Sequence, residues 1–315
     1  MKKFLLLFLF PAIVFGQDAF SKKPAEKEST LSTDVTINED VKGTLLMPEN
    51  QANKTLVILL TGSGPNDRDG NSMMTKNDSH KQLAQALQKE GIATYRYDKR
   101  TATRLKERRS VDDIKFQDFV TDASSVINHF VDDKRFDKIY MAGHSQGSLV
   151  AMLALNDEVD GFISIAGPGE TIDKSIIQQV GAQSPGLDKQ VETVFNKMKA
   201  QDSLVTDYPA YLNSIFNPSL QPFMKEWMSH DPALVISKLE LPVLIVNGDQ
   251  DTQIDIKQAK LLHTAAPQAD YYIIKDMNHV LKKVGSDPLE NAKSYSDPNF
   301  PLHEELVQRI VDFVK

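Results

Sequence analysis

The chain has 315 residues, of which 41% are hydrophobic and 25% are charged, as is usual for a soluble protein with one large domain or two modest ones. Its formal net charge of −7 offers no electrostatic basis for binding nucleic acid or an anionic membrane surface. The absence of cysteine from the sequence excludes disulfides and a lipid-modified N-terminal cysteine, so the fold must be held together by its own core.

The N-terminal segment has the pattern of a signal peptide. Two lysines precede an apolar stretch over residues 4–10, and the segment ends at Gly16, a small residue of the kind that signal peptidases favour. About fourteen apolar residues, interrupted by a proline, are fewer than the roughly 20 that a membrane-spanning helix needs, which argues against an uncleaved anchor. We therefore expect a signal peptide over residues 1–16, export to the periplasm or the medium, and a flexible leader over residues 17–30. No stable membrane insertion is expected after cleavage.

From residue 31 onward, strand signals alternate with helix signals. The expected strands are 31–37, 41–47, 55–60, 92–97, 136–142, 161–166, 241–246 and 271–274. The expected helices include 78–90, 116–131, 148–155 and 302–314, and a further one around residue 263. The first two strands are close enough in sequence to form an antiparallel pair. The remaining alternation predicts an α/β fold, in which a mostly parallel sheet is covered by helices on both faces.

One long stretch, residues 168–238, departs from this alternation. It has helical character and no clear strand, and it carries the only tryptophan of the chain, Trp227, among several phenylalanines and methionines. An insertion near the carboxyl edge of a parallel sheet would lie over the crevice where such folds bind ligands. We expect it to be a helical cap, with a peripheral subdomain unrelated to the ligand as the alternative.

A pentapeptide, Gly143-His144-Ser145-Gln146-Gly147, joins an apolar strand to a helical run. Strand, Gly-x-Ser-x-Gly, helix is the context of a nucleophile elbow, a turn so sharp that the serine is held in a strained backbone conformation. The flanking glycines are needed because a Cβ there would collide with the adjoining strand or helix. The alternative is a glycine-rich turn without chemistry.

A serine hydroxyl is a poor nucleophile, and it needs a base within hydrogen-bond reach that a carboxylate in turn orients. In proteins with this motif the partners follow in the chain order Ser, Asp or Glu, His. Two loops that follow expected strands supply them, since residues 247–252 contain two aspartates and residues 275–280 contain His279. His263 falls within an expected helix and His303 at the beginning of the last one, so we expect His279 to be the base.

These motifs, in this order, resemble those of the α/β-hydrolases, and most closely the exported bacterial esterase and serine aminopeptidase-like branch. The resemblance runs from about residue 31 to the end of the chain and rests on the elbow, on Gly-Asp-Gln-Asp at residues 248–251 and on Asn-His at residues 278–279. It implies an α/β-hydrolase domain over residues 31–315 with a helical cap. It also implies that the acid is Asp251, the second aspartate of its turn, with Asp249, Asp255 or another residue as the alternatives.

The oxygen of a tetrahedral intermediate needs two hydrogen-bond donors. One is expected to be the backbone N–H of Gln146, the residue after the serine. The other should come from the glycine-rich loop at residues 61–70, where resemblance to the family's His-Gly-x-Gly loop implies the Ser63 N–H. Thr61 stands where the family commonly has histidine. Residues 67–69 (Asp-Arg-Asp) are expected to form an ion-pair cluster that holds this loop, with substrate contact as the alternative.

Two further sites bear on the expected chemistry. Residues 98–103 lie where relatives often carry Asp-x-Arg-Gly-x-Gly in a loop that borders the active site, and both glycines are replaced here. We therefore expect a stiffer loop and an altered substrate preference. His144 is expected to pack away from Ser145 rather than to take part in catalysis.

These features together predict a serine hydrolase that cleaves carboxylic esters through an acyl-enzyme, with Ser145 as nucleophile, His279 as base and Asp251 as acid. The aromatic and methionine side chains of the cap suggest an apolar or aromatic acyl group, unless they are simply core. A small-peptide peptidase with the same triad and a catalytically silent binding protein are the alternatives. The usual sequence motifs for dinucleotides, phosphates and metals are absent, so we expect no cofactor and no metal. The expected partner is a small-molecule ester or acylated substrate and not nucleic acid, and the sequence carries no signal for oligomeric state.

Overall fold

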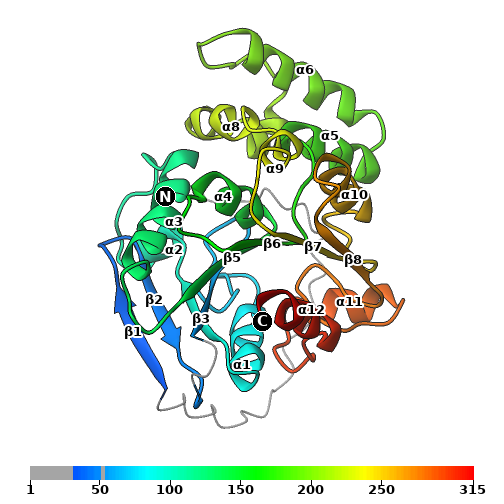
Figure 1. The fold of residues 1–315 in the computed structure, drawn as a ribbon. Helices are drawn as coiled ribbons and strands as arrows, with labels where there is room; N and C mark the ends of the chain where they lie inside the picture. The colour runs from blue at the N-terminus through cyan, green and yellow to red at the C-terminus, as the bar shows by residue number, and fades with distance from the viewer. Residues whose placement is uncertain (1–30, 51–53) are drawn as a thin grey trace, which may run out of the picture.

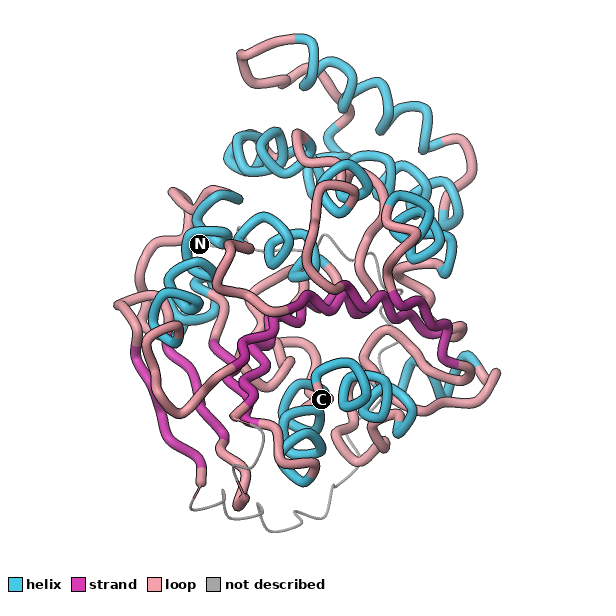
Figure 2. The backbone as a smooth tube through the Cα atoms, viewed as in Figure 1, coloured by secondary structure: helices cyan, strands magenta, loops and turns pink. Residues whose placement is uncertain are grey.

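A computed structural model of the protein describes residues 31–50 and 54–315, and the expected signal peptide and leader lie outside these residues. The described residues form an eight-stranded sheet in the order β1-β2-β4-β3-β5-β6-β7-β8, and Figure 2 shows its strands as a curved band between helices. The strands are β1 Ser32–Thr36, β2 Lys42–Leu46, β3 Thr55–Leu60, β4 Ala93–Tyr97, β5 Lys138–His144, β6 Gly161–Ile165, β7 Val243–Gly248 and β8 Asp270–Ile274. Strand β2 is antiparallel to both β1 and β4, whereas every pairing from β4 to β8 is parallel.

Helices cover both faces of this sheet, as expected. Figure 1 shows α1, α11 and α12 on one side and α3, α4 and α10 on the other. The α-helices are α1 Ser79–Lys89, α2 Arg100–Lys106, α3 Phe116–Phe130, α4 Gln146–Ala154, α5 Ile172–Gln183, α6 Leu187–Ala200, α7 Asn213–Phe216, α8 Gln221–Met228, α9 Pro232–Ile236, α10 Ile256–Ala265, α11 Pro288–Ser294 and α12 Glu304–Val314. Two short 3-10 helices are η1 Ala210–Leu212 and η2 Pro218–Leu220. Within the described ranges, no helix combines the length and apolarity needed to cross a membrane.

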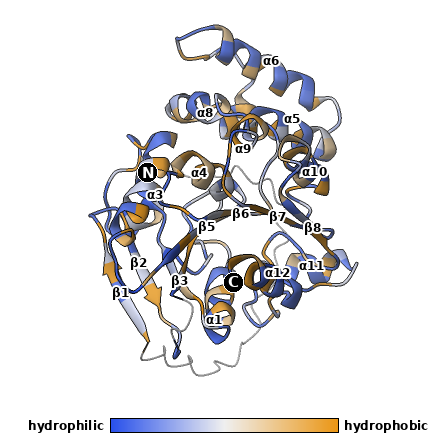
Figure 3. Cartoon of the chain, viewed as in Figure 1, coloured by the Kyte–Doolittle hydropathy of each residue, from blue (hydrophilic) through white to orange (hydrophobic). Residues whose placement is uncertain are grey.

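Strand β3 explains why a continuous apolar run is needed at the centre of the sheet. Alternate side chains of a strand point to opposite faces, and here Leu56, Ile58 and Leu60 pack in the core that includes α3 and α4. Val57 and Leu59 pack in the second core, with α1 and α12. In Figure 3 strands β6 and β7 are coloured mostly as hydrophobic, whereas the outer helix α6 is mostly hydrophilic. The sheet is therefore buried on both faces, as parallel sheets require.

The sequence-based expectation was wrong at residues 98–103, which were expected to form a loop. The structure has helix α2 there, beginning at Arg100. A helix of this length shows no clear apolar periodicity, and ion pairs rather than an apolar stripe attach it to the rest of the fold. Helix α11 was also not expected, and the last helix begins at Glu304 rather than at residue 302.

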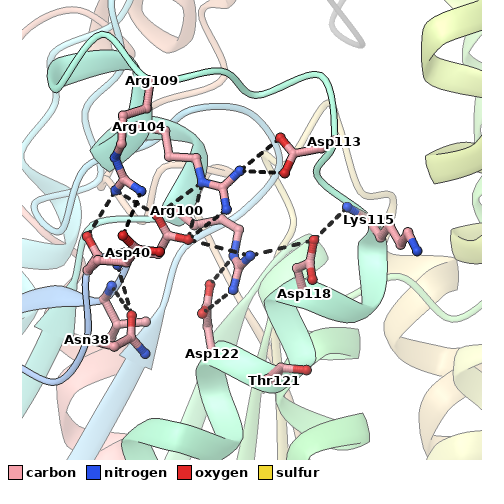
Figure 4. Close-up of polar contacts among 12 residues, drawn as sticks. Asn38, Asp40, Arg100, Arg104, Arg109, Asp113, Lys115, Asp118, Thr121 and Asp122 are labelled. Atoms are coloured by element: carbon pink, nitrogen blue, oxygen red, sulfur yellow. Dashed lines mark hydrogen bonds and ion pairs between the residues drawn. The ribbon is translucent and has the colours of Figure 1, made fainter.

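The ion pairs of α2 form a connected network with the β1–β2 turn and with α3 (Figure 4). Arg100 donates two hydrogen bonds to the buried carboxylate of Asp122 on α3, at 2.6 and 2.7 Å. Arg104 contacts Asp40 in the β1–β2 turn at 2.9 Å, and Arg109 reaches the same carboxylate at 2.7 Å. Because Asp40 and Asp122 are almost fully buried, their negative charges depend on these arginines for compensation. The network thus attaches α2 and the residues after it to α3 and to the β1–β2 turn.

The stretch between β6 and β7, where every residue is described, is helical and contains no strand. Its aromatic and methionine side chains are mostly core. Trp227 stacks on Phe116 of α3 with ring centroids 5.7 Å apart and an interplanar angle of 12°, and Met224 and Met228 are buried with it. These contacts favour a packing role over contact with an acyl group. The proposed covering of the crevice by this insertion stays a prediction.

The second residue of helix α1, His80, is a buried histidine in contact with the candidate site. The side chain of His80 is almost inaccessible to solvent, and its ring meets that of His144 edge to face, with centroids 5.3 Å apart. Burial lowers the pKa of His80 to about 4, against an opposing hydrogen bond with the Leu60 backbone. His80 therefore stays neutral in the folded protein over most of the acidic range.

This burial predicts a pH-dependent stability. Between pH 6.5 and about 4 an unfolded histidine takes up a proton whereas folded His80 does not, so the free energy of unfolding falls as pH falls through that window. The expected slope from one such group is up to about 1.4 kcal/mol per pH unit. Urea unfolding at several pH values should show a shallower decline for His80→Leu than for the wild type. Parallel declines would show that His80 is not held neutral by the fold.

Candidate active site

Ser145 lies in a strained turn between β5 and α4. Its backbone has φ 54° and ψ −123°, in a region that residues with a side chain rarely adopt. A Cβ added to Gly143 would lie 2.3 Å from the Gly147 carbonyl oxygen, and one added to Gly147 would lie 2.6 Å from the Thr61 carbonyl oxygen. Neither glycine can be replaced without moving backbone. The elbow therefore depends on glycine on both sides of the serine.

The structure brings His279 and Asp251 together. The Nδ1 atom of His279 lies 2.7 Å from Asp251 Oδ2, and both side chains are buried, with 5% and 0% of their surface exposed. The other carboxylate oxygen of Asp251 accepts the backbone N–H groups of Gln253 and Ile254, each at 2.8 Å. Because a carboxylate of this kind only accepts, Nδ1 carries the hydrogen and Nε2 is left as an acceptor. This is the tautomer that a general base for a serine requires.

The alternatives for acid and base lie elsewhere. Asp249 is exposed and accepts the backbone N–H of Asp276 at 2.7 Å, and Asp255 caps α10 by accepting from the Lys257 N–H. His263 stacks on Tyr271 with centroids 4.7 Å apart, and His303 caps α12. Each has a local structural role, and among the described residues none of the four bonds to Asp251 or to His279.

A hydrogen bond from His144 connects the loop that carries His279 to the elbow. The Nε2 atom of His144 lies 2.8 Å from the backbone carbonyl oxygen of His279, and the two rings lie 4.7 Å apart. Burial holds the pKa of His144 well below its usual value, with the neighbouring histidines adding to the effect. A neutral His144 thus donates to the His279 backbone and fixes the loop, which is the packing role expected for it. Within the described residues no hydrogen bond joins the Ser145 hydroxyl to His279, and in unliganded triads this contact often forms only with substrate.

A buried polar network holds the two loops of the acid and the base against each other. Asn291 of α11 donates to the Gln250 carbonyl oxygen at 2.9 Å, and its own carboxamide oxygen accepts from Asn278 at 2.9 Å. Lys282, two residues after the base loop, is fully buried and donates to Gln82 at 2.6 Å and to a backbone carbonyl at 3.0 Å. Burial lowers the pKa of Lys282 to about 8. Sequence reasoning missed this network because its members are scattered over more than two hundred residues.

The expected oxyanion loop lies against the serine. A Cβ on Gly62 would be 3.0 Å from the Ser145 Cβ, so Ser63 follows a residue in contact with the elbow. The side chain of Asn66 donates to the carbonyl oxygens of Gly62 and Ser63, at 3.2 and 2.7 Å. Gln146 is the first residue of α4, where backbone N–H groups have no partner within the helix. The expected donors therefore come from segments that adjoin Ser145.

The three charged residues of this loop hold it, but not by pairing with one another. Arg68 pairs with Asp98 at 3.0 Å and with Asp34 at 2.8 Å, and Asp69 pairs with Arg96 of β4 at 2.9 Å. Asp67 accepts the backbone N–H of Asn71 at 2.9 Å inside the loop. The expectation of a structural role is supported, and the expected partners were wrong because the loop folds back over β4.

Across residues 31–50 and 54–315, no group of three or more histidines and carboxylates is placed to hold a metal ion. Ser145 follows β5, Asp251 follows β7 and His279 follows β8, so a hydroxyl, a carboxylate and an imidazole lie after the carboxyl ends of these strands.

The chain is similar in sequence or in structure to several proteins that are named esterases. A protein of Thermotoga maritima named Esterase EstD is 26% identical over 268 residues, which are 81% of this chain and 61% of that protein. The chain thus spans less than two thirds of the length of this curated relative. The solved structure of Est1E from Butyrivibrio proteoclasticus has a TM-score of 0.55 at 17% identity, over 90% of this chain and 98% of that one. An esterase of Pyrococcus furiosus has a TM-score of 0.53 at 16% identity, over 90% and 89%.

The sequence identities to these solved structures are low, so the structural similarity establishes the fold alone. The fold is that of the α/β-hydrolases, as expected. Residues 75–282, well over half of the chain, match the family described as Serine aminopeptidase, S33. That range contains the elbow, the acid loop and the base loop. The chain therefore belongs to the S33 serine aminopeptidase family of α/β-hydrolases.

Proposed function

We propose that this protein is a serine hydrolase that cleaves carboxylic esters of small molecules through a covalent acyl-enzyme. The observation that carries the proposal is the buried pair of His279 and Asp251, held by His144 beside the strained Ser145. The names of the relatives, which include esterases, support the choice of ester substrates. The description of the family supports the alternative, a peptidase that acts on small peptides with the same three residues.

In the proposed mechanism the Ser145 hydroxyl attacks the acyl carbon while its proton passes to Nε2 of His279. The resulting imidazolium keeps its Nδ1–H on Asp251, which holds the ring and stabilises its charge. The backbone N–H groups of Gln146 and Ser63 receive the negative oxygen of the tetrahedral intermediate. His279 then returns the proton to the leaving alcohol, and the acyl group stays on Ser145. A water molecule then attacks the acyl-enzyme, with His279 again acting as the base. This step releases the carboxylic acid product and restores the Ser145 hydroxyl.

The proposal predicts how three variants behave with aryl esters. Ser145→Ala and Asp251→Asn should each lower kcat by about 10⁴-fold or more, since one removes the nucleophile and the other the group that fixes the imidazole tautomer. Asp249→Asn is the matched control, because asparagine keeps an oxygen for the Asp276 N–H, and it should stay within about tenfold of wild type. Initial rates with a series of aryl esters and aminoacyl anilides measure both points. Turnover of the anilides alone would favour the peptidase, and equal losses in the two aspartate variants would contradict the assignment of Asp251.

We also propose that the protein is exported, on the strength of the lysines and the apolar run at its N-terminus. Fractionation of bacterial cells that produce the full chain should recover a form that begins near Gln17 outside the cytoplasm. A variant without residues 2–16 should stay inside the cells. Full-length protein that remains in the cytoplasm would contradict the export proposal and would leave the chemistry unaffected.

A further inference from the structure

Lys99 is a buried cation close to the elbow that the proposed triad does not use. Lys99 lies between β4 and α2, and only 7% of its surface is exposed. Its ammonium donates to the Gly62 carbonyl oxygen at 2.8 Å and to the side-chain oxygen of Gln146, and it lies 4.3 Å from the centre of the Phe119 ring. Within the described residues no carboxylate lies within ion-pair distance of it. A buried cation without a counterion is costly, and such groups gather at functional sites.

The bond to Gly62 fixes the direction of the next amide. No cis peptide bond occurs among the described residues, and in a planar trans peptide the carbonyl and the following N–H point in opposite directions. Holding the Gly62 carbonyl on Lys99 and Asn66 therefore aims the Ser63 N–H away from them. Ser63 carries one of the two donors in the proposed mechanism.

The Lys99 ammonium also bonds to the residue that carries the second proposed oxyanion donor, Gln146. Its bond to the Gln146 carboxamide ties it to the first residue of α4, whose backbone N–H is the other proposed donor. Lys99 is itself held in place, because its own N–H donates to the Asn66 carbonyl oxygen at 3.1 Å. On either side of it Asp98 pairs with Arg68 and Arg100 pairs with Asp122 (Figure 4 shows the second pair).

We propose that Lys99 is a positioning residue that aligns the two oxyanion-binding amides, those of Ser63 and Gln146, through its bonds to the Gly62 carbonyl and the Gln146 side chain. This inference rests on the proposed serine hydrolase function. Burial lowers the pKa of Lys99 to about 7, which agrees with an ammonium enclosed by the protein.

The test compares Lys99→Met with the wild type in kcat, in KM and in the affinity for a trifluoromethyl ketone, which forms a tetrahedral adduct with an active-site serine. Misplacing oxyanion donors should lower kcat by about 10²- to 10³-fold. The inhibition constant of the ketone should rise by a similar factor, and KM should stay within about threefold. A merely structural role would not weaken the tetrahedral adduct selectively. Lys106→Met is the matched control, because it removes the same charge from α2 at a side chain that is 56% exposed.

Each outcome decides the proposal. If wild type turns over esters and Lys99→Met keeps its kcat and its ketone affinity, the positioning role is wrong while the proposed function stands. If wild type has no activity that Ser145→Ala abolishes, the proposed function fails and the role of Lys99 fails with it. If Lys99→Met does not fold, as judged by urea unfolding, Lys99→Gln replaces it, since glutamine keeps a donor for the Gly62 carbonyl and should show a smaller loss of the same kind.

Discussion

The backbone contact between the β5–α4 elbow and the end of β3 is the constraint on which the rest of the site depends. The Gly147 backbone approaches the Thr61 carbonyl so closely that no side chain fits between them. This approach allows a left-handed serine at the end of the strand and places the glycine-rich loop beside it. The buried parallel strands on either side supply the rigidity that such a strained turn requires.

Buried polar groups rather than apolar contacts then set the details of the site. Asn291 joins the acid loop to the base loop, His144 joins the base loop to the elbow, and Lys99 joins the elbow to the glycine-rich loop. Each of these bonds removes a polar group from water, which is tolerable only because its partners are in place. The large two-sided core offsets that cost and keeps the partners aligned. The site is thus a series of loops that hydrogen bonds link to one another at the carboxyl ends of the parallel strands.

The sequence was sufficient to predict those parts of the structure that have a local sequence pattern. The apolar run of β3, the glycines of the elbow and the alternation of strands and helices all follow from spacing and residue type. Helix α2 was missed because it is short and is attached by ion pairs to Asp40 and Asp122, which are distant in sequence. No sequence pattern indicated that Lys99 and Asn291 belong to the site, since a lysine or an asparagine in a polar segment is usually solvated. Their partners are defined only when β3, β4 and α11 meet in the folded chain.

The central claim is that Ser145 is an activated nucleophile, and covalent labelling tests it most directly. Wild-type protein treated with a fluorophosphonate should gain one adduct per chain, found on Ser145 by peptide mass spectrometry. Ser145→Ala should gain none under the same conditions. A wild-type protein that stays unlabelled, or a Ser145→Ala protein labelled to the same extent, would contradict the account.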